Sequence, residues 1–412
     1  MRILLLTQYY PPETGAPQNR LSGLARELKA AGHHPVILTA MPNYPAMEIH
    51  ASYKGKKWVR EEMDGIDVYR SWIYVSKNRS IISRLLNYFS FTFSSIWYHR
   101  RINEEFDAVL CESPPLFLGI SAWWIAKRRN ANMIFNVSDL WPESAEKLGV
   151  ITNRFFLNMA TKLEEFLYRK SFLITGQTKG IVKDIQRRFP AKKVHWLPNG
   201  VDDSIFSAQP NSNWRKDNGY NEAEFLILYA GIIGLAQGLD IILDAAKQLP
   251  ASTNIRFLLL GEGPEKERLQ ERMSMENIPH VHFLPLVSRK EIPAIVSSID
   301  AAVIPLRKMD LFLGAIPSKI FENLALKKPI LLAVDGEARE LFIDQGKCGL
   351  YIAPENHQQL ASAALQLAEN PELCKTLGEN GYSYVRSHFM RSAITQQFIR
   401  AYEETLSSSD NK

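Results

Sequence analysis

The segment Val303-Ile-Pro-Leu-Arg-Lys-Met-Asp-Leu-Phe-Leu-Gly-Ala-Ile-Pro-Ser-Lys-Ile-Phe-Glu-Asn-Leu-Ala-Leu326 predicts a buried strand, a loop and a helix. The strand is the apolar run 301–306, and the helix is expected to begin at Pro317, whose missing N–H needs no partner there. The N–H groups of Ser318 and Lys319 then point back toward the strand end, with the positive end of the helix dipole. This arrangement predicts an anion site, most naturally for a phosphate.

Glu322 lies three residues after Lys319, so both side chains share one face of the predicted helix. A carboxylate at this point suits a pair of sugar hydroxyl groups better than it suits a phosphate. An ordinary strand–loop–helix with an exposed Lys–Glu pair fits the same spacing, and the pattern alone does not separate the two interpretations.

The composition is that of a soluble globular protein with roughly two domains. The chain has 412 residues, of which 46% are hydrophobic and 23% charged, and its formal net charge is +5. No dense cluster of basic residues indicates a nucleic-acid partner. The three cysteines lie far apart without metal-ligand spacing, which fits a reducing cytoplasm. The sequence shows no signal-peptide pattern and no apolar stretch long enough to span a bilayer.

Strand and helix patterns alternate along the chain, which indicates parallel, doubly wound α/β sheets with ligands beyond the carboxyl ends of the strands. A helix follows the first strand, ends at Gly32 and is expected to bury Leu21, Leu24, Ala25 and Leu28. The predicted strands are 3–7, 36–39, 108–111, 133–137, 172–176 and 194–197, then 225–230, 255–260, 281–284, 301–306 and 330–333. The turn cluster 198–202 predicts a domain junction. We expect domains at 1–198 and 199–385, and a helical tail at 386–412 that packs back on the first domain.

Glycine-bearing turns follow three predicted strands of the second half, at Gly231/Gly234, Gly261/Gly263 and Gly314. One such turn is most often only a tight turn, but three in one domain together with Lys319 favour a nucleotide diphosphate lying across them. In the first half, Gly15 precedes the first helix, where a small residue lets the backbone approach a ligand closely.

Six short motifs carry a resemblance to a known family. They are Gln8-Tyr-Tyr-Pro-Pro-Glu-Thr-Gly15, Pro42-Asn-Tyr-Pro45, Asp139-Leu-Trp-Pro-Glu143, Pro198-Asn-Gly-Val-Asp202, Gly261-Glu-Gly-Pro264 and Pro317-Ser-Lys-Ile-Phe-Glu322. Over nearly its whole length the chain resembles the family 4 glycosyltransferases of the GT-B fold, particularly the surface-polysaccharide group. The resemblance implies two Rossmann-like domains facing a cleft, with a nucleotide sugar held mainly by the second.

The resemblance also implies roles for single residues. Glu322 matches the second Glu of the family's Glu-x7-Glu signature, which binds the ribose hydroxyls, and Gly15 matches a glycine that approaches the donor phosphates. The expected donor site consists of Gly15, Gly231, Gly234, Gly261, Gly263, Arg307, Ser318, Lys319 and Glu322. The expected acceptor side includes Asn43, Tyr44 and Trp141, although each of these two aromatic residues is also a common packing residue.

Four positions depart from the family pattern. The first Glu of the signature falls on Gly314, a family His falls on Ser138, and the family's phosphate-binding Arg and Lys fall near Ile232 and Gln237, which carry no charge. Lys319, with Arg307, is therefore the candidate that neutralises the leaving diphosphate.

The expected chemistry needs no metal, because the chain contains no Asp-x-Asp motif and the helix dipole and Lys319 would replace the ion. No cofactor is expected. Asp139 could accept the proton of the acceptor hydroxyl, or could instead be a loop carboxylate bonded to backbone. Retention of anomeric configuration is implied by the resemblance alone.

The segment 77–101 has apolar residues at helical spacing and basic residues at both ends. The apolar positions are Ile82, Leu85, Leu86, Phe89, Phe93, Ile96 and Trp97, and the basic ones are Lys77, Arg79, Arg84, Arg100 and Arg101. Such a helix can lie in an anionic membrane surface or face the protein core, and the core interpretation is the more common. The family's usual acceptor, a lipid-linked sugar, favours the membrane interpretation.

The sequence thus predicts a hexosyl- or N-acetylhexosaminyl-type transferase. It would act on the cytoplasmic side, peripherally on the membrane, and move a sugar from a UDP donor to a lipid-linked saccharide of an O-antigen or capsule. Two alternatives stay open. A non-hydrolysing sugar-nucleotide epimerase would have the same two-domain fold, and a non-catalytic sugar-nucleotide-binding subunit would explain the missing cationic residues.

Overall fold

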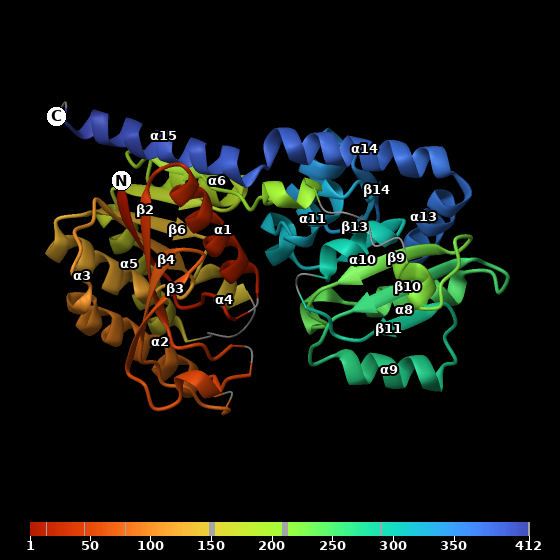
Figure 1. Ribbon diagram of the computed structural model, residues 1–412, viewed down its shortest axis with the longest axis horizontal. Coiled ribbons are helices and arrows are strands. Elements are labelled where there is room, and N and C mark those ends of the chain that lie inside the picture. Colours follow the sequence, from red (N-terminus) through yellow and green to blue (C-terminus); the bar gives the residue numbers. More distant parts are fainter. Residues whose placement is uncertain are drawn as a thin grey trace. The chain divides into compact units, whose positions relative to one another are not determined.

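The computed structural model describes residues 1–13, 15–44, 46–78, 80–147, 153–207, 213–288 and 291–410. Thr14 and Pro45 of the family motifs and Arg79 of the predicted basic flank lie outside the described residues. The chain forms two compact units, Met1–Asn199 with Arg391–Lys412 and Gly200–Met390 (Figure 1).

Unit 1 is built on one sheet with the strand order β3-β4-β2-β1-β5-β6-β7-β8. All described neighbours in it are parallel except the antiparallel pair β3–β4. The strands are β1 Arg2–Leu6, β2 His34–Ala40, β3 Trp58–Met63, β4 Ile66–Ser71, β5 Ala108–Ser113, β6 Asn132–Val137, β7 Leu173–Gly176 and β8 Val194–Trp196.

Helices cover both faces of this sheet (Figure 1). Side chains of α2, α3, α5 and α6 join the core on one face, and those of α1 and α15 join the core on the other. The helices are α1 Ala16–Ala30, α2 Ile81–Tyr98, α3 Leu118–Arg129, α4 Glu143–Lys147, α5 Arg154–Lys170, α6 Lys179–Arg188 and α15 Arg391–Asp410, with the short 3-10 helices η1 Ala51–Tyr53 and η2 His99–Arg101. The last helix of the chain therefore completes the core of the unit that contains the first strand.

Unit 2 is built on a second parallel sheet with the order β11-β10-β9-β12-β13-β14. Its strands are β9 Phe225–Ala230, β10 Ile255–Leu260, β11 Val281–Leu284, β12 Ala301–Pro305, β13 Ile330–Ala333 and β14 Gly349–Tyr351. Its α-helices are α7 Trp214–Asp217, α8 Asp240–Gln248, α9 Lys266–Met275, α10 Ile292–Ser298, α11 Lys319–Ala325, α12 Glu337–Arg339, α13 His357–Glu369 and α14 Pro371–His388. Shorter turns are η3 Asp203–Ser207, η4 Leu235–Gln237, η5 Asp310–Gly314 and the π-helical η6 Glu340–Gln345.

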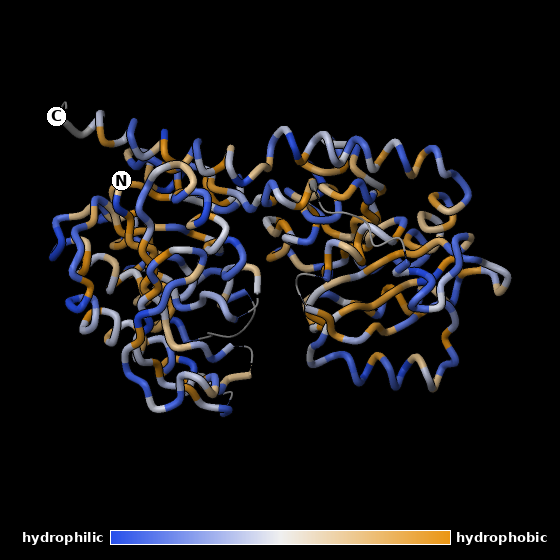
Figure 2. The backbone as a smooth tube through the Cα atoms, in the orientation of Figure 1, coloured by the Kyte–Doolittle hydropathy of each residue, from blue (hydrophilic) through white to orange (hydrophobic). Residues whose placement is uncertain are grey.

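The strands of both units are near-continuous apolar runs because helices cover them on both faces. Figure 2 shows hydrophobic residues concentrated along these strands, whereas hydrophilic residues dominate helices such as α9. The α/β fold class with two doubly wound parallel sheets, predicted from the alternating patterns, is confirmed.

The first helix ends as predicted. Gly32 adopts the left-handed φ of +82°, and the His33 N–H donates to the Leu28 carbonyl at 2.9 Å, which is the bond of a Schellman cap. The expected buried face is confirmed, since its four members, Leu21, Leu24, Ala25 and Leu28, are at most 5% exposed.

The sequence interpretation missed the hairpin β3–β4 at the edge of the first sheet. Asp64 and Gly65 connect the two strands with φ of +54° and +69°. An Asp-Gly pair with two positive φ values is the signal of a two-residue hairpin turn, so the sequence did contain a clue. The alternation of apolar and polar residues in the strands beside this turn is weak, because β3 lies at the exposed edge of the sheet and carries charged residues.

Candidate functional site

Two glycine-bearing loops of unit 2 lie against each other at the carboxyl ends of β9 and β10. The Gly231 N–H donates to the Leu260 carbonyl at 2.9 Å, and the Ile233 N–H donates to the Glu262 carbonyl at 2.9 Å. Gly261 has a φ of +154°, and a Cβ atom at this position would lie 1.8 Å from the Gly231 carbonyl oxygen. Glycine is therefore required by both the backbone conformation and the close approach.

The carboxyl end of β12 lies at the same edge of the sheet. The Arg307 N–H donates to the Ala236 carbonyl at 2.9 Å, and the side chain of Arg307 lies against Gly238, which has a left-handed φ of +58°. Gly234 precedes η4, and Gly263 lies so close to Ile233 that a Cβ atom would be 2.2 Å from that carbonyl oxygen. The predicted turns at Gly231/Gly234 and Gly261/Gly263 are thus one packed set of loops, whereas Gly314 ends the 3-10 helix η5.

Lys319 points into this set of loops. Its Nζ atom lies 3.7 Å from the centroid of the Tyr229 ring and 2.9 Å from where a Cβ of Gly231 would stand. Burial lowers the pKa of Lys319 to about 7, and the charge of Glu322 acts in the opposite direction. Desolvation disfavours the ammonium form, so the charge of Lys319 in the free protein changes near neutral pH.

The helix start also differs from the prediction. The regular helix α11 begins at Lys319, not at Pro317, and Ser318 is its N-cap residue without a side-chain capping bond. The Ile320 N–H donates to the Pro317 carbonyl at 3.1 Å and the Phe321 N–H to the Ser318 carbonyl at 3.3 Å. Pro317 therefore stands at the first position of the turn that leads into the helix. The N–H groups of Ser318 and Lys319 precede these first bonds, as expected.

In unit 1, the loops after β1 and β2 are joined by a buried carboxylate that the sequence interpretation did not select. Glu13 Oε1 accepts bonds from the N–H groups of Asn43 at 2.7 Å and Tyr44 at 2.8 Å, and Oε2 accepts one from Tyr10 at 3.2 Å. Burial raises the pKa of Glu13, and these three backbone bonds act against that rise. Glu13 thereby positions two of the acceptor-side candidates.

The remaining candidates of unit 1 lie at the carboxyl edge of its sheet. Gly15 caps the start of α1 with extended backbone, and a Cβ there would meet the Gln18 side chain. Burial raises the pKa of Asp139, whereas hydrogen bonds from Ser144 and from the Leu140 backbone lower it. These bonds agree with the loop-carboxylate interpretation of Asp139 and leave its role as a proton acceptor untested.

A second network missed by the sequence interpretation is centred on Glu112, which is 3% exposed at the end of β5. Its carboxylate pairs with the Arg20 guanidinium and accepts bonds from Asn136 Nδ2 at 2.5 Å and Ser138 Oγ at 2.6 Å. Arg20 also donates to Gln177 Oε1 at 3.0 Å. These residues come from four separate segments, so no sequence spacing connects them. Ser138, where the family has a His, is one of them.

The amphipathic helix α2 presents four of its seven predicted apolar residues to solvent. Ile82, Leu86, Phe93 and Trp97 are 71%, 49%, 66% and 67% exposed. Its inward face carries Phe91 but also the buried polar residues Asn87, Thr92, Ser94 and Ser95. Phe89 is half-buried against Phe117, which in turn contacts Trp141 with ring centroids 5.6 Å apart. The core interpretation is therefore wrong for the four exposed residues.

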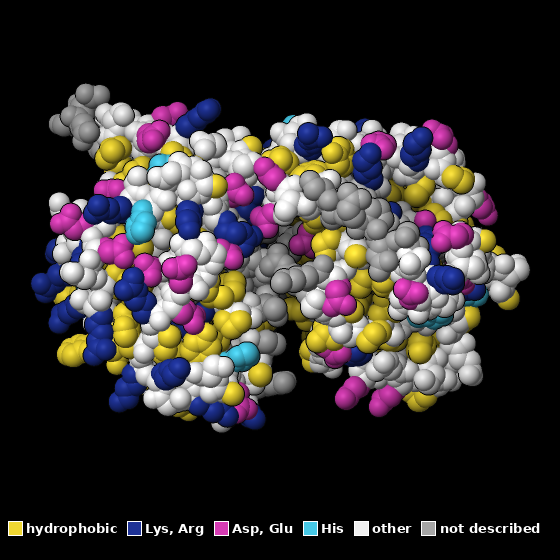
Figure 3. All heavy atoms as spheres, in the orientation of Figure 1, with side chains coloured by type: hydrophobic (Ala, Val, Ile, Leu, Met, Phe, Trp, Pro, Cys, Tyr) yellow, Lys and Arg dark blue, Asp and Glu magenta, His cyan; other side chains and the backbone are white. Residues whose placement is uncertain are grey.

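Basic side chains accompany this exposed apolar face. The Arg100 guanidinium lies over the Trp97 ring at 5.7 Å, and Arg128 of α3 lies over Trp124 at 5.0 Å. Figure 3 shows hydrophobic and basic side chains side by side over α2 and α3. Within the described residues, none of the helices is both long and apolar enough to cross a bilayer. No cluster of metal-ligating side chains was found among them either.

Two family models match the chain over most of its length. The model "Glycosyl transferase 4-like domain" matches residues 15–200, and the model "Glycosyl transferases group 1" matches residues 210–384. The chain belongs to the family 4 glycosyltransferases. The resemblance stated from the motifs is thereby confirmed.

Known proteins similar to this glycosyltransferase agree with that assignment. WcaI of Escherichia coli (strain K12), which carries a provisional assignment as a colanic acid biosynthesis glycosyl transferase, is 26% identical and the match spans 97% of this chain and 99% of WcaI. Sucrose-phosphate synthase from Thermosynechococcus elongatus has a TM-score of 0.77 at 16% identity, with 99% and 100% of the two chains covered. Anabaena HepE, solved with UDP-glucose, has a TM-score of 0.71 at 17% identity, with 99% and 100% covered. The GT-B fold is shown. Neither the epimerase nor the non-catalytic binding subunit is favoured by these comparisons.

Proposed function

We propose that this glycosyltransferase moves a sugar from a UDP-linked donor to a lipid-linked saccharide acceptor in cell-surface polysaccharide biosynthesis, with retention and without a metal ion. The observation that carries the proposal is the packed set of glycine loops in unit 2 with Lys319 pointing into it. Backbone N–H groups, a helix start and one amine at the ends of parallel strands are the features that hold a nucleotide diphosphate. The colanic acid assignment of WcaI and the UDP-glucose complex of HepE support the substrate class.

In this proposal, Lys319 stabilises the leaving diphosphate. Negative charge grows on the diphosphate as the glycosidic bond breaks, and a fixed donor at developing charge is worth roughly 3–4 kcal/mol. A bound diphosphate favours the ammonium form of Lys319. The amine, whose pKa is about 7 in the free protein, would therefore be protonated when the donor is bound. Arg307 and the N–H groups of Ser318 and the glycine loops would add further donors.

Glu322 would accept hydrogen bonds from donor hydroxyl groups, one helical turn from the diphosphate. Gly15 would approach the donor from unit 1, and Asn43, Tyr44 and Trp141 would contact the acceptor. The raised pKa of Asp139 fits a carboxylate that accepts a proton from the acceptor hydroxyl during transfer.

The exposed apolar face of α2 supports a lipid-linked acceptor and a peripheral site on the cytoplasmic face of the membrane. Aromatic and aliphatic side chains flanked by Arg84, Arg100 and Arg101 are typical of helices that lie in an anionic membrane surface. A soluble acceptor would give no reason to keep four large apolar side chains in water.

The test combines the purified protein with a panel of UDP-, GDP- and dTDP-sugars and a polyprenyl-diphosphate saccharide in detergent, with and without EDTA. The proposal expects UDP release only with the acceptor present, insensitivity to EDTA, and a product with the donor's anomeric configuration by NMR. Conversion of the donor without any acceptor would instead indicate an epimerase. Tight donor binding without turnover on any acceptor would indicate a binding subunit.

A further inference from the structure

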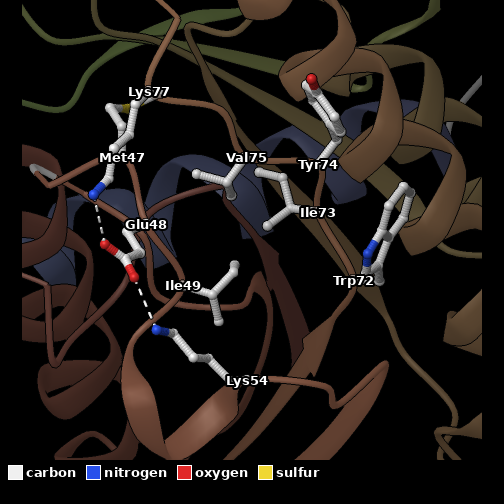
Figure 4. A pocket seen from close by; sticks show the side chains of 9 residues that line it. All are labelled: Met47, Glu48, Ile49, Lys54, Trp72, Ile73, Tyr74, Val75 and Lys77. Atoms are coloured by element: carbon white, nitrogen blue, oxygen red, sulfur yellow. Dashed lines mark hydrogen bonds and ion pairs between the residues drawn. The ribbon is translucent and has the colours of Figure 1, made fainter.

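Unit 1 contains a pocket of about 450 Å³ that none of the predicted site residues lines. Its walls come from the segment after β2 and the segment after β4, so it opens at the carboxyl edge of the sheet, the edge that binds ligands in this fold. Figure 4 shows a row of charged side chains, Lys54, Glu48 and Lys77, on one side of the pocket and Trp72 and Tyr74 on the other. The volume lies in the range of small-ligand sites.

The aromatic wall is held in place by the polar inward face of α2. The Tyr74 N–H donates to Ser90 Oγ at 2.8 Å, Asn87 Nδ2 donates to the Tyr74 carbonyl at 2.7 Å, and Ser94 Oγ donates to the Trp72 carbonyl. These bonds replace the strand partners that the segment lacks beyond the end of β4, and they explain why α2 is polar on its inner side.

The side chains of this segment alternate as in a strand. Trp72 and Tyr74 are 44% and 36% exposed, whereas Ile73 between them is 2% exposed. The buried Ile73 anchors the backbone of the segment, and the two exposed rings lie beside the pocket.

The charged wall offers both donors and acceptors. Glu48 Oε1 lies 2.8 Å from Lys54 Nζ, and Glu48 Oε2 lies 3.0 Å from Lys77 Nζ. Hydrogen bonds from Lys54 and then Lys77, together with their charges, lower the pKa of Glu48 to about 2, so the carboxylate stays ionised. The three groups together carry one net positive charge.

We propose that this pocket binds a saccharide and holds the glycan part of the acceptor, an inference that rests on the proposed function. Aromatic rings fit the apolar C–H faces of a pyranose, while hydroxyl groups need fixed donors and acceptors around the ring edge. A phosphate or diphosphate fits less well, because Glu48 stands between the two amines. The net positive charge admits neutral sugars and sugars with one carboxylate.

The experiment is saturation-transfer NMR on the full chain without donor, with maltotetraose, cellotetraose, mannotetraose and tetragalacturonate as probes. At least one probe is expected to bind, with its Kd raised tenfold or more in Trp72→Ala and in Glu48→Gln. Glu48→Gln changes an exposed side chain and keeps the test informative if Trp72→Ala unfolds. Phe155→Ala, which removes an exposed aromatic side chain from α5, is the control and is expected to bind as wild type does.

The inference is overturned if no probe binds at millimolar concentration, or if binding is the same in wild type and both pocket variants. UDP in the same experiment separates this inference from the proposed function. If UDP binds and no saccharide does, the assignment of the pocket as a saccharide site is refuted, while the proposed function stands. Saccharide binding by a protein that turns over no UDP-sugar leaves a saccharide site and removes the proposed function.

Discussion

The Nζ atom of Lys319 lies 3.7 Å from the centroid of the Tyr229 ring, directly beside the loop that starts at Gly231. The ring face attracts the ammonium form, whereas burial disfavours it and, against the charge of Glu322, lowers the pKa of Lys319 to about 7. Lys319 is therefore an amine whose charge depends on what is bound next to it.

Replacing this amine is expected to slow transfer with little effect on folding. Lys319→Ala should lower kcat about a hundredfold, because it removes one donor from the developing charge of the diphosphate. The measurement is UDP release with a saturating donor, with circular dichroism to check the fold. Lys375→Ala on the exposed side of α14 is the control and should keep wild-type turnover. Wild-type kcat in Lys319→Ala would contradict the assignment.

The pKa of Lys319 predicts a pH dependence of UDP binding. In the free protein the amine is mostly protonated below pH 7 and mostly neutral above it, whereas a bound diphosphate raises its pKa. Binding above pH 7 must therefore take up a proton, and the affinity for UDP should fall by up to about tenfold per pH unit as the pH rises from 7 to 9. Calorimetry at pH 8 in Tris and in HEPES should show uptake of about one proton by wild type and none by Lys319→Ala. Equal uptake in both proteins would refute the prediction.

The close contact between the two glycine loops predicts that one added methyl group, in Gly261→Ala, destabilises the protein. Gly261→Ala would place a Cβ atom 1.8 Å from the Gly231 carbonyl oxygen at a φ of +154°. We expect the free energy of unfolding to fall by roughly 2–3 kcal/mol, together with a loss of UDP affinity. Denaturation by urea followed by circular dichroism measures the first effect and calorimetry the second.

The matched control is Gly234→Ala, since at a φ of −126° the new Cβ would crowd the flexible Gln237 side chain and make only ordinary contact with the Ile232 side chain. Its stability should change by less than about 1 kcal/mol. Equal stability losses in the two variants would show that the close approach at Gly261 is not what requires glycine.

The exposed face of α2 predicts membrane binding. Phe93→Glu/Trp97→Glu replaces two side chains that are 66% and 67% exposed, so the fold should be retained while the apolar contact with lipid is lost. Flotation with phosphatidylglycerol vesicles should fall at least about tenfold. Met275→Glu on α9, which is 76% exposed, is the control and should float as wild type does. If the double variant floats equally well, another surface binds the membrane or none does.

Much of the fold could be predicted from the sequence because the relevant signals are local. Apolar runs and helical periodicity located the strands and the first helix, and glycine after a strand located the loops of unit 2. The spacing of Lys319 and Glu322 placed both on one face of a helix for the same reason. Each of these inferences depends on residues a few positions apart, whose geometry the backbone alone sets.

Only the tertiary structure decided which groups lose contact with water and which distant residues meet. Arg20 and Glu112 are 92 positions apart, and the bonds from the Asn43 and Tyr44 N–H groups to Glu13 join two loops that no spacing connects. The pKa of Lys319 depends on burial by Tyr229 and its surroundings, and the helical pattern of α2 was the same whether its apolar face met protein or solvent. Desolvation and long-range pairing are properties of the folded chain, since they arise only when segments far apart in the sequence are brought together.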